Sequence, residues 1–311
     1  ESVKRALEVA AAGGHNLIMI GSPGSGKSMM AKRLPSILPP LSLAESLETT
    51  KIHSVAGKLN KNDSLIATRP FRSPHHTISQ VAMVGGGSNP QPGEISLAHN
   101  GLLFLDELPE FNRNTMEVLR QPIENGTITI SRAACALTYP CSVMLICAMN
   151  PCPCGYYGHP TRSCSCPNGA PARYLSKVSG PLLDRLDIHI EVPPVDYNQL
   201  ADKEEGESSA TIRERVNKAR KIQIERFKGT GITCNAKMTS ALTRKYCALS
   251  PSASKILQTS FEKLGLSARA YDKVLKVART IADLDESETV ENKHILEAIQ
   301  YRSLDRKFWK S

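Results

Sequence analysis

The order of apolar and polar positions divides the chain into two parts. Over the first two thirds, short apolar runs alternate with segments in which apolar residues recur at helical spacing. Such alternation is typical of parallel strands joined by helices. The apolar runs that we predict to be buried strands cover residues 16–20, 101–105, 142–150 and 188–192. After residue 210 only helical spacing remains, which predicts an α/β domain followed by a small all-helical domain.

Capping residues and glycines set the helix boundaries in the first part. Ser42 and Glu45 have the spacing of a capping box, which predicts a helix running from Ser42 toward Gly57. The pair Gly13-Gly14 ends a predicted N-terminal helix. The remaining helices of this part are predicted at residues 2–12, 28–34 and 112–121.

Two stretches depart from the alternation. Residues 59–92 contain the run RPFRSPHH and three successive glycines, which predicts an insertion of loops and a hairpin outside the core sheet. Its paired histidines, His75 and His76, would suit a metal site. Because no partner with ligand spacing lies nearby, we interpret them as loop or substrate-contacting residues. Alternating Thr and Ile at 126–132 predict one arm of a second hairpin, with Arg132 toward its tip and the other arm near 136–139.

Five segments of helical spacing make up the last third of the chain. They cover residues 210–227, 238–246, 252–264, 268–282 and 289–301. A polar and charged stretch at 202–209 has the composition of a linker. The predicted domains are therefore an α/β domain at residues 1–196 and a helical domain at 207–311.

The first predicted strand leads into a phosphate-binding loop. The loop consists of Gly21, Ser22, Pro23, Gly24, Ser25, Gly26, Lys27 and Ser28, which match G-x-x-x-x-G-K-[ST] at every fixed position. Glycines let backbone N–H groups turn inward around phosphates, the lysine reaches the β- and γ-oxygens, and the serine hydroxyl is a ligand for Mg²⁺. With a strand before it and a helix after it, the loop predicts nucleotide binding.

Two later strands end in polar residues suited to the same chemistry. The run LLFLDE delivers Asp106 to the end of a buried strand, where its carboxylate can hold Mg²⁺ together with Ser28. Glu107 follows directly and is suited to deprotonating an attacking water. Asn150 ends the next strand, at the edge of an α/β sheet that faces the ligand, where its amide could hold the water or the γ-phosphate.

A cysteine-rich loop at 151–169 follows Asn150. Its two C-x-C pairs are separated by nine residues and could supply four thiolates to one tetrahedral Zn²⁺. The four cysteines are Cys152, Cys154, Cys164 and Cys166, and His159 could replace one thiolate. The alternative is a surface loop with reduced cysteines; we favour zinc. The isolated cysteines are interpreted as core or helix residues, namely Cys135, Cys141, Cys147, Cys234 and Cys247.

Charge and composition limit the partners. Lys and Arg together number 39 against 30 Asp and Glu, a net charge of +9 that suits a polyanion such as nucleic acid. A surface tuned for solubility would explain the same charge. No apolar run approaches the length of a membrane span and no signal peptide is visible, so we expect a cytoplasmic protein without a membrane partner. In that compartment nine cysteines do not indicate a disulfide framework.

The motifs GSPGSGKS, LLFLDE and LLDRLD, in this order, resemble those of an AAA+ ATPase. The insertion and the hairpin resemble the branch that contains MCM helicases and the magnesium chelatase ATPase subunit. Closer still, FRSPHHTIS, GGGSNPQPGEISLAHNGLLFLDELPEF and NPCPCGYYGHP resemble the magnesium-chelatase-like ComM/YifB family of bacteria. The resemblance covers nearly the whole chain and implies a P-loop NTPase fold with a helical lid. It also implies an upstream domain like that of the Lon protease.

The resemblance implies roles for individual residues. These are Lys27 and Ser28 in Walker A, Asp106 and Glu107 in Walker B, Asn150 as sensor 1, Arg185 as arginine finger and Arg269 as sensor 2. An arginine finger supplied by a neighbouring subunit makes hydrolysis depend on assembly. The alternative for Arg185 is a salt bridge with Asp184 or Asp187.

The resemblance also implies a mechanism. It predicts a Mg²⁺-dependent ATPase that assembles into a ring, a hexamer, and moves pore hairpins that pull on DNA during branch migration in recombination and natural transformation. Arg132 and residues 72–76 are the candidates for facing the pore. A second hypothesis is a chelatase-type or chaperone-like motor acting on a protein partner, and a third is a nucleotide-gated assembly module without motor action.

Overall fold

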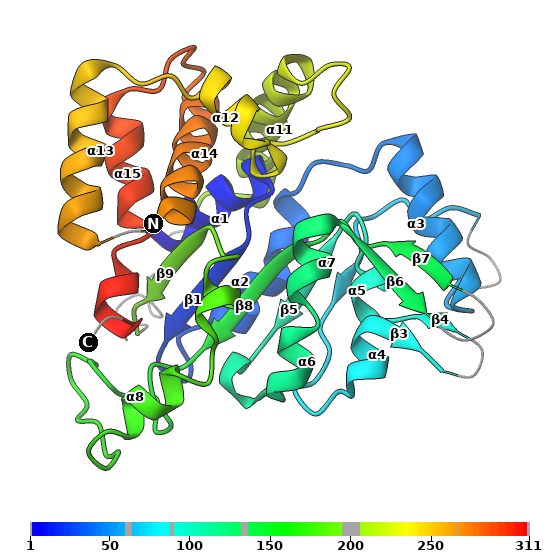
Figure 1. Cartoon of the computed structure of the whole chain (residues 1–311), viewed down its shortest axis with the longest axis horizontal. Helices are drawn as coiled ribbons and strands as arrows, with labels where there is room; N and C mark the ends of the chain where they lie inside the picture. The colour runs from blue at the N-terminus through cyan, green and yellow to red at the C-terminus, as the bar shows by residue number, and fades with distance from the viewer. Residues whose placement is uncertain are drawn as a thin grey trace. The chain divides into compact units, whose positions relative to one another are not determined.

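The computed structural model describes residues 2–59, 64–87, 90–131, 136–194, 206–265 and 267–309. Five parallel strands form the central sheet in the order β2-β5-β8-β1-β9; Figure 1 labels β5, β8, β1 and β9 of this sheet. Their bounds are β1 Leu17–Gly21, β2 Phe71–Arg72, β5 Leu102–Leu105, β8 Met144–Met149 and β9 Ile188–Val192. The predicted α/β fold with a helical C-terminal part is therefore confirmed.

The chain folds as two compact units, which are described separately. The first unit comprises residues 1–39, 150–176 and 186–311, and the second comprises residues 40–149 and 177–185. The first unit contains the phosphate loop, the cysteine-rich loop and the C-terminal helices, whereas the second contains the insertion and Asp106.

In the first unit, β1 pairs in parallel with β9 from Leu17 opposite Ile188 to Gly21 opposite Val192. Every residue of β1 is buried, as expected of a parallel strand covered on both faces. Helix α1 (Ser2–Gly13) precedes this strand and buries most of its residues, while α2 (Lys27–Arg33) and a 3-10 turn (Leu34–Ile37) follow it. Pro35 lies in the turn, so α2 ends where the proline predicts.

The helical part of the first unit matches the predicted segments closely. Its helices are α11 (Ser209–Arg226), α12 (Ser240–Tyr246), α13 (Pro251–Leu264), α14 (Ala268–Leu284) and α15 (Asn292–Gln300). Serine or threonine side chains cap the first four of these helices at their N-termini. Helix α14 buries the face formed by Val274, Val277, Ala278 and Ile281, and α13, α15 and α14 stand side by side (Figure 1).

Short elements complete the first unit. They are α8 (Ala170–Leu175), a 3-10 turn at Asn235–Lys237 and a π-helical turn at Asp305–Trp309. Part of the predicted linker, residues 202–205, lies outside the described residues, and α11 begins at Ser209. The predicted domain division at residues 196 and 207 stays a prediction.

The second unit holds three strands of the sheet and two small hairpins. Helix α3 (Leu43–Val55) opens with the predicted capping box, in which Ser42 and Glu45 each accept from the other's backbone N–H. The two-residue strands β3 (Gly85–Gly86) and β4 (Gln91–Pro92) form the hairpin predicted in the insertion. Strands β6 (Thr127–Ser131) and β7 (Ala136–Pro140) form the second predicted hairpin. Its tip, with Arg132 and Cys135, lies outside the described residues.

The remaining helices of this unit are short: α4 (Gln80–Val84), α5 (Glu94–Leu97), a 3-10 turn (Leu108–Glu110), α6 (Arg113–Glu117), α7 (Arg120–Asn125) and α9 (Gly180–Leu183). The prediction of a single helix at 112–121 is wrong, because two helices, α6 and α7, divide this segment. Pro122 lacks an N–H and clashes with a preceding turn, so a new helix starts at Arg120 and carries Pro122 in its first turn.

A second correction concerns the insertion, which we predicted to lie wholly outside the core sheet. Phe71 and Arg72 form the edge strand β2, parallel to β5. The ring of Phe71 stacks on that of Phe104 with 6.0 Å between centroids, and the N–H of Leu102 donates to the carbonyl of Pro70. The prolines on both sides of this dipeptide hid the strand, because proline argues against strand structure in sequence.

No helix among the described residues combines the length and the apolar character that crossing a bilayer would require.

Candidate nucleotide-binding site and cysteine cluster

The backbone of the phosphate loop depends on its glycines. Gly24 and Gly26 have φ angles of +77° and +86°, a region that residues with a Cβ rarely adopt. A Cβ on Gly21 would lie 2.5 Å from the carbonyl oxygen of Val192. Gly21 therefore permits close strand packing, and Gly24 and Gly26 permit the turn that brings Lys27 to the start of α2.

Lys27 lies at the centre of this loop and is only 8% exposed. Its ammonium donates to the carbonyls of Gly21 and Ser22, each at 2.8 Å, and to the Asn150 amide oxygen at 3.3 Å. The structure thus brings together the predicted lysine of the loop and the predicted polar residue after β8, which are 123 positions apart in sequence. Ser28 follows Lys27 in the first turn of α2.

A pocket of about 270 Å³ lies beside the same helix. Its apolar lining comes from three separate segments of the first unit, with Leu7 from α1, Met29, Met30 and Leu34 from α2 and the following turn, and Ile212 from α11. The sequence analysis did not identify it, because residues from segments this far apart form no local pattern. The consecutive Met29-Met30 pair directly after the loop was the one available indication; Met29 is exposed and Met30 is half-buried.

The two carboxylates lie in the second unit, directly after β5. The Asp106 carboxylate accepts from the N–H of Glu107 at 2.9 Å, and Glu107 adopts a positive φ of 52°. The Glu107 side chain is 58% exposed, and its carboxylate lies 3.3 Å from Nδ1 of His76. The sequence analysis missed this contact, because it interpreted His76 as a loop or substrate-contacting residue.

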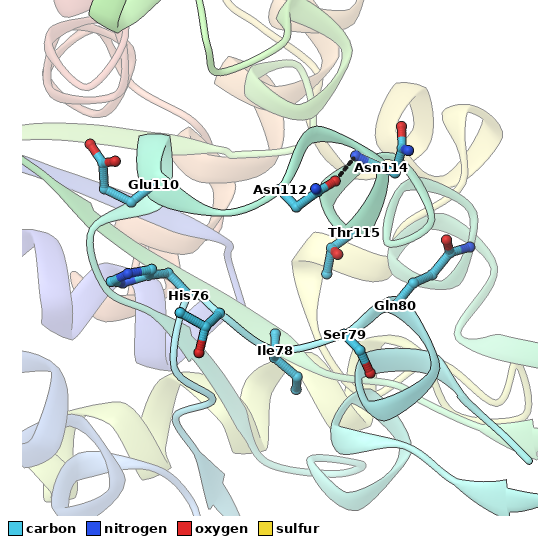
Figure 2. Close-up of a pocket in the computed structure, with 9 residues that line it drawn as sticks. His76, Ile78, Ser79, Gln80, Glu110, Asn112, Asn114 and Thr115 are labelled. Carbon is cyan, nitrogen blue, oxygen red and sulfur yellow. Dashed lines mark hydrogen bonds between the residues drawn. The ribbon is translucent and has the colours of Figure 1, made fainter.

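A polar pocket of about 570 Å³ adjoins this contact. Figure 2 shows His76 and Glu110 at one end of the pocket and Asn114 and Gln80 at the other, with Asn112 and Thr115 between them. The Asn112 side chain accepts from the N–H of Asn114 at 2.9 Å, so it caps α6. His76 also contacts the ring of Phe111 edge-on, with 6.3 Å between centroids.

Arg185 is held within the second unit. Its guanidinium pairs with the Glu124 carboxylate at 2.6 Å, and Nε donates to the carbonyl of Arg120 at 3.0 Å. Only 10% of the side chain is exposed. Arg185 thus forms an ion pair with Glu124, a partner that the sequence did not indicate. Arg269 lies in the first turn of α14, where it is exposed.

Asp187, in the same LLDRLD motif as Arg185, belongs to a buried network of the first unit. Its carboxylate accepts from the N–H of Asn16 at 2.9 Å, pairs with Lys273 of α14, and lies 3.5 Å from Nδ1 of His15. Burial alone would raise the pKa of Asp187, but Lys273 and His15 hold that pKa well below its usual range. Complete burial lowers the pKa of His15, whose Nε2 lies 2.7 Å from the Thr280 hydroxyl.

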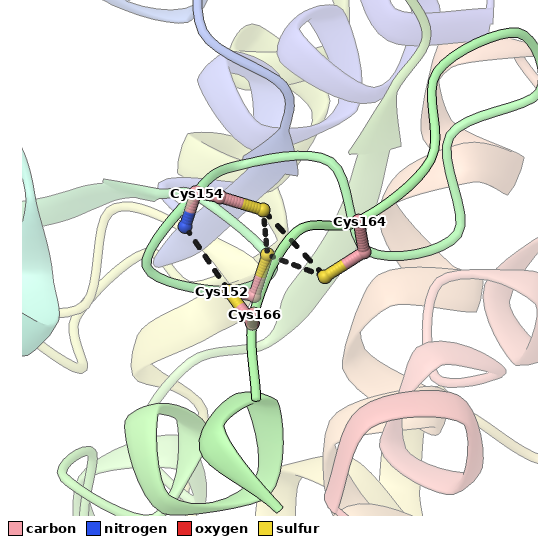
Figure 3. Close-up of side chains that lie close together, drawn as sticks. All are labelled: Cys152, Cys154, Cys164 and Cys166. Carbon is pink, nitrogen blue, oxygen red and sulfur yellow. Dashed lines mark hydrogen bonds between the residues drawn. The ribbon is translucent and has the colours of Figure 1, made fainter. Parts of the chain in front are cut away.

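The four predicted cysteines converge in the cysteine-rich loop of the first unit. The sulfur atoms of Cys152, Cys154, Cys164 and Cys166 all lie within 4.8 Å of one another, and Figure 3 shows them turned inward. The Sγ–Sγ distances are 3.4 Å for Cys152–Cys154, 3.7 Å for Cys152–Cys164 and 3.5 Å for Cys154–Cys164. These distances exclude disulfides, whose sulfurs lie about 2.05 Å apart.

Backbone amides are directed at the sulfurs. The N–H of Tyr157 donates to Cys152 and that of Cys154 donates to Cys166. Backbone N–H groups lower the pKa of Cys154 to about 5, whereas burial raises that of Cys152 to about 12. Nδ1 of His159 faces the backbone N–H groups of Thr161 and Arg162. The ligand set that the geometry favours is therefore the four sulfurs without His159.

The isolated cysteines within the described residues, Cys141, Cys147, Cys234 and Cys247, are buried, as predicted. The paired histidines are not part of a metal cluster: in the described part of the chain, the one group of three or more metal-ligating residues close enough to share an ion is the cysteine cluster.

A parallel sheet, a phosphate loop between β1 and α2, and a helical C-terminal part define a P-loop nucleotide-binding protein of the AAA+ type. Two family models match the chain. The model for magnesium chelatase, subunit ChlI covers residues 1–200, and that for the ChlI C-terminal region covers residues 206–302. The chain belongs to the magnesium-chelatase-like ComM/YifB family.

Individual relatives agree with this assignment. The chain is 49% identical over 310 residues to the uncharacterized protein YifB of Salmonella typhimurium and 46% identical over 308 residues to the competence protein ComM of Haemophilus influenzae. Each match covers 98% of this chain and 59% of the relative, so the chain spans only part of these proteins. The magnesium-chelatase subunit ChlI of Euglena gracilis is 24% identical over 156 residues, covering 43% of this chain and 45% of that protein.

Proposed function

We propose that this protein is a Mg²⁺-dependent ATPase. The observation that carries the proposal is the buried Lys27 ammonium, which donates both to its own phosphate loop and to Asn150. A cation held by neutral carbonyl and amide oxygens makes stronger, charge-assisted hydrogen bonds when phosphate oxygens replace them. The two glycines with positive φ direct backbone N–H groups toward the same phosphates.

The other roles follow from chemistry. Ser28 and Asp106 offer the hard oxygen ligands that Mg²⁺ prefers, and the ion supplies charge neutralisation on the phosphates. Glu107 accepts the proton of the attacking water, and Asn150 orients that water or the γ-phosphate. The 270 Å³ pocket beside α2 offers Met29 and Met30 to the apolar faces of a nucleobase.

Arg185 acts, in this proposal, as an arginine finger for a neighbouring copy of the chain in a ring, for which the family resemblance predicts a hexamer. The ion pair with Glu124 holds the guanidinium in the single chain, so assembly must exchange Glu124 for the γ-phosphate. Arg269, exposed at the start of α14, contacts the nucleotide as sensor 2. In this proposal, ATP hydrolysis therefore needs Arg185 and Arg269 as well as the phosphate loop.

We propose DNA as the cargo, acted on in the cytoplasm during recombination. The net charge of +9 and the 46% identity to a protein named for competence support this proposal. The β6–β7 hairpin would carry Arg132 toward the DNA backbone. A motor acting on a protein partner is the second candidate, favoured by the two magnesium-chelatase family models.

ATP turnover with branched, single-stranded and duplex DNA, at low and physiological salt, distinguishes the two candidates. We expect DNA to stimulate turnover and the stimulation to fall steeply with salt, because phosphate contacts release counterions. Arg132→Ala should reduce both stimulation and DNA affinity. Turnover that responds to no DNA would contradict the DNA proposal and favour the protein partner.

The arginine finger has a sharper test. Lys27→Ala and Arg185→Ala should each be inactive alone, the second by about 10³-fold or more. Mixing the two variants should restore part of the activity, because a Lys27→Ala subunit supplies Arg185 to an intact phosphate loop next to it. Mixtures that stay inactive, while each variant still assembles, would exclude Arg185 as a residue acting between subunits.

We also propose that the cysteine cluster holds a structural Zn²⁺. Four thiolates at about 2.3 Å from one tetrahedral ion have sulfurs about 3.8 Å apart, and the closest three sulfurs here are separated by 3.4 to 3.7 Å. Tetrahedral sulfur ligands suit zinc. Zinc would leave no open position for catalysis at this site, so its contribution is to the fold of the loop.

A further inference from the structure

We infer that the metal-bound cysteine loop braces the phosphate loop, so that metal loading controls nucleotide affinity. This inference rests on the proposed Zn²⁺ site and concerns residues 152–166, which lie in the same compact unit as the phosphate loop. It assigns the metal a role in the ATP site without placing it in the reaction.

The contact between the two loops is made by Gly155 and Pro23. A Cβ built on Gly155 would lie 2.4 Å from Cδ of Pro23 and 2.6 Å from its Cγ. Gly155 also has a φ of +85° and closes a turn in which its N–H donates to the carbonyl of Cys152. The turn that carries two of the sulfurs therefore packs its backbone directly against the proline of the phosphate loop.

A second connection runs through Asn150. This residue contacts Lys27 at 3.3 Å and precedes the first sulfur ligand by only two positions. Cys152 itself is buried. A metal that fixes Cys152 also fixes the backbone that follows Asn150. The contacts of Asn150 with Lys27 and of Gly155 with Pro23 are then both held in place.

The packing between the loops leaves little space. An open pocket of about 30 Å³ lies where they meet the end of β9, lined by Gly21 and Ser22 from the phosphate loop, by Gly155, Tyr157 and Gly158 from the cysteine-rich loop, and by Val192 and Pro193. A space of this volume accommodates about one water molecule. A displacement of the cysteine-rich loop would therefore be transmitted to Gly21 and Ser22, whose carbonyls accept from Lys27.

The loop needs a cross-link to exert this effect. Between Cys152 and Cys166 it forms turns and bends but no helix or strand, so backbone hydrogen bonds alone do not define its conformation. Ordering such a segment costs conformational entropy, and metal coordination offsets this cost. Without metal, the loop samples conformations in which Gly155 no longer packs on Pro23.

Two glycine variants test the contact between the loops without changing the metal ligands. Gly155→Ala keeps all four cysteines but inserts a methyl group against Pro23. Gly158→Ala is the matched control, since Gly158 lies in the same loop, also has a positive φ of +75°, and would carry a Cβ with no neighbour within 4 Å. Both proteins are purified without chelator, assayed for zinc and iron by mass spectrometry, and titrated with a fluorescent ADP analogue.

We expect about one equivalent of zinc in both variants and nucleotide affinity about tenfold weaker in Gly155→Ala only. Removing the zinc from the unmodified protein, with a chelator and a reductant, should weaken nucleotide binding to a similar extent, and adding zinc back should restore it. Adding Pro23→Gly to Gly155→Ala should recover part of the affinity, because it removes the atoms against which the new methyl group packs.

Each failure has its own meaning. Equal affinities in the two glycine variants, with zinc bound, would overturn the brace and leave the zinc site standing. Less than about a tenth of an equivalent of zinc, or iron in its place, would overturn the zinc site and the inference with it. Nucleotide binding that survives Lys27→Ala undiminished would instead contradict the proposed ATP site.

Discussion

The two groups of residues that we propose for nucleotide chemistry, one in each unit and called here the two halves, differ in how their key side chains are held. In the first unit, Lys27 is 8% exposed and donates to two carbonyls and to Asn150. In the second unit, Glu107 is 58% exposed, and its carboxylate lies 3.3 Å from Nδ1 of His76. The half that we propose to bind phosphates is built into the backbone, whereas the half that we propose to activate water depends on a side chain at the surface. Binding and turnover should therefore be separable by mutation.

The largest expected effect is on the exposed half. Glu107→Gln removes the proposed base but keeps the size of the side chain, so turnover should fall by about 10²- to 10⁴-fold. Nucleotide affinity should stay within about twofold of the unmodified protein, as measured by equilibrium titration. Full turnover in this variant would exclude Glu107 as the base.

The next largest effect is expected on the buried half. Lys27→Ala removes a charged donor to phosphate, a contact of about 1.5–3 kcal/mol, which corresponds to about 10- to 100-fold in affinity. The same titration measures it, with circular dichroism to show that the fold is retained. If Lys27→Ala bound nucleotide normally and only turnover fell, the assignment of nucleotide binding to the buried half would be contradicted.

A smaller effect is expected at His76. The contact with Glu107 is partly exposed, and such pairs contribute about 0.2–1 kcal/mol, so His76→Ala should lower turnover by no more than about fivefold and leave nucleotide affinity unchanged. The control is Gln80→Ala, which alters the opposite end of the same pocket (Figure 2). Equal turnover in both variants and the unmodified protein would mean that His76 does not position Glu107.

The last prediction concerns a different quantity, the stability of the unit that carries the phosphate loop. Burial lowers the pKa of His15, so below pH about 6.5 the unfolded chain takes up a proton that the folded chain excludes. Stability should then fall by up to about 1.4 kcal/mol per pH unit. The depressed pKa of Asp187 adds a further loss below about pH 4.

Thermal unfolding at pH 7.5, 6.5 and 5.5 measures this dependence. His15→Gln cannot titrate and should give a flatter profile, even if its stability at pH 7.5 is lower. His75→Gln is the control, because His75 is exposed and its loss should leave the slope unchanged. Identical slopes in all three proteins would show that His15 does not carry the acid sensitivity.

The elements that sequence predicted well are those with local causes. Strand β9 occupies the predicted residues, and the capping box of Ser42 and Glu45 forms with both of its hydrogen bonds. The two errors have different causes, one nonlocal and one local. Phe71 joins the sheet because its ring meets Phe104, and the helix expected at 112–121 divides so that Pro122 falls in a first turn.

For the site, sequence by itself determined the chemical groups and their local geometry. A phosphate loop is a matter of backbone conformation over eight residues, and the glycines and lysine that permit it are adjacent in sequence. Cysteine spacing likewise predicted four ligands on one loop. These features need no knowledge of the fold because the residues that cooperate are close along the chain.

Only the tertiary structure decided which distant groups meet. It paired Lys27 with Asn150, Glu107 with His76 and Arg185 with Glu124, and it packed Gly155 of the cysteine-rich loop on Pro23 of the phosphate loop. The physical reason is that these contacts depend on the packing of whole strands and helices, which leaves no periodicity in the sequence. The contact between the cysteine-rich loop and the phosphate loop therefore becomes apparent only in the folded chain.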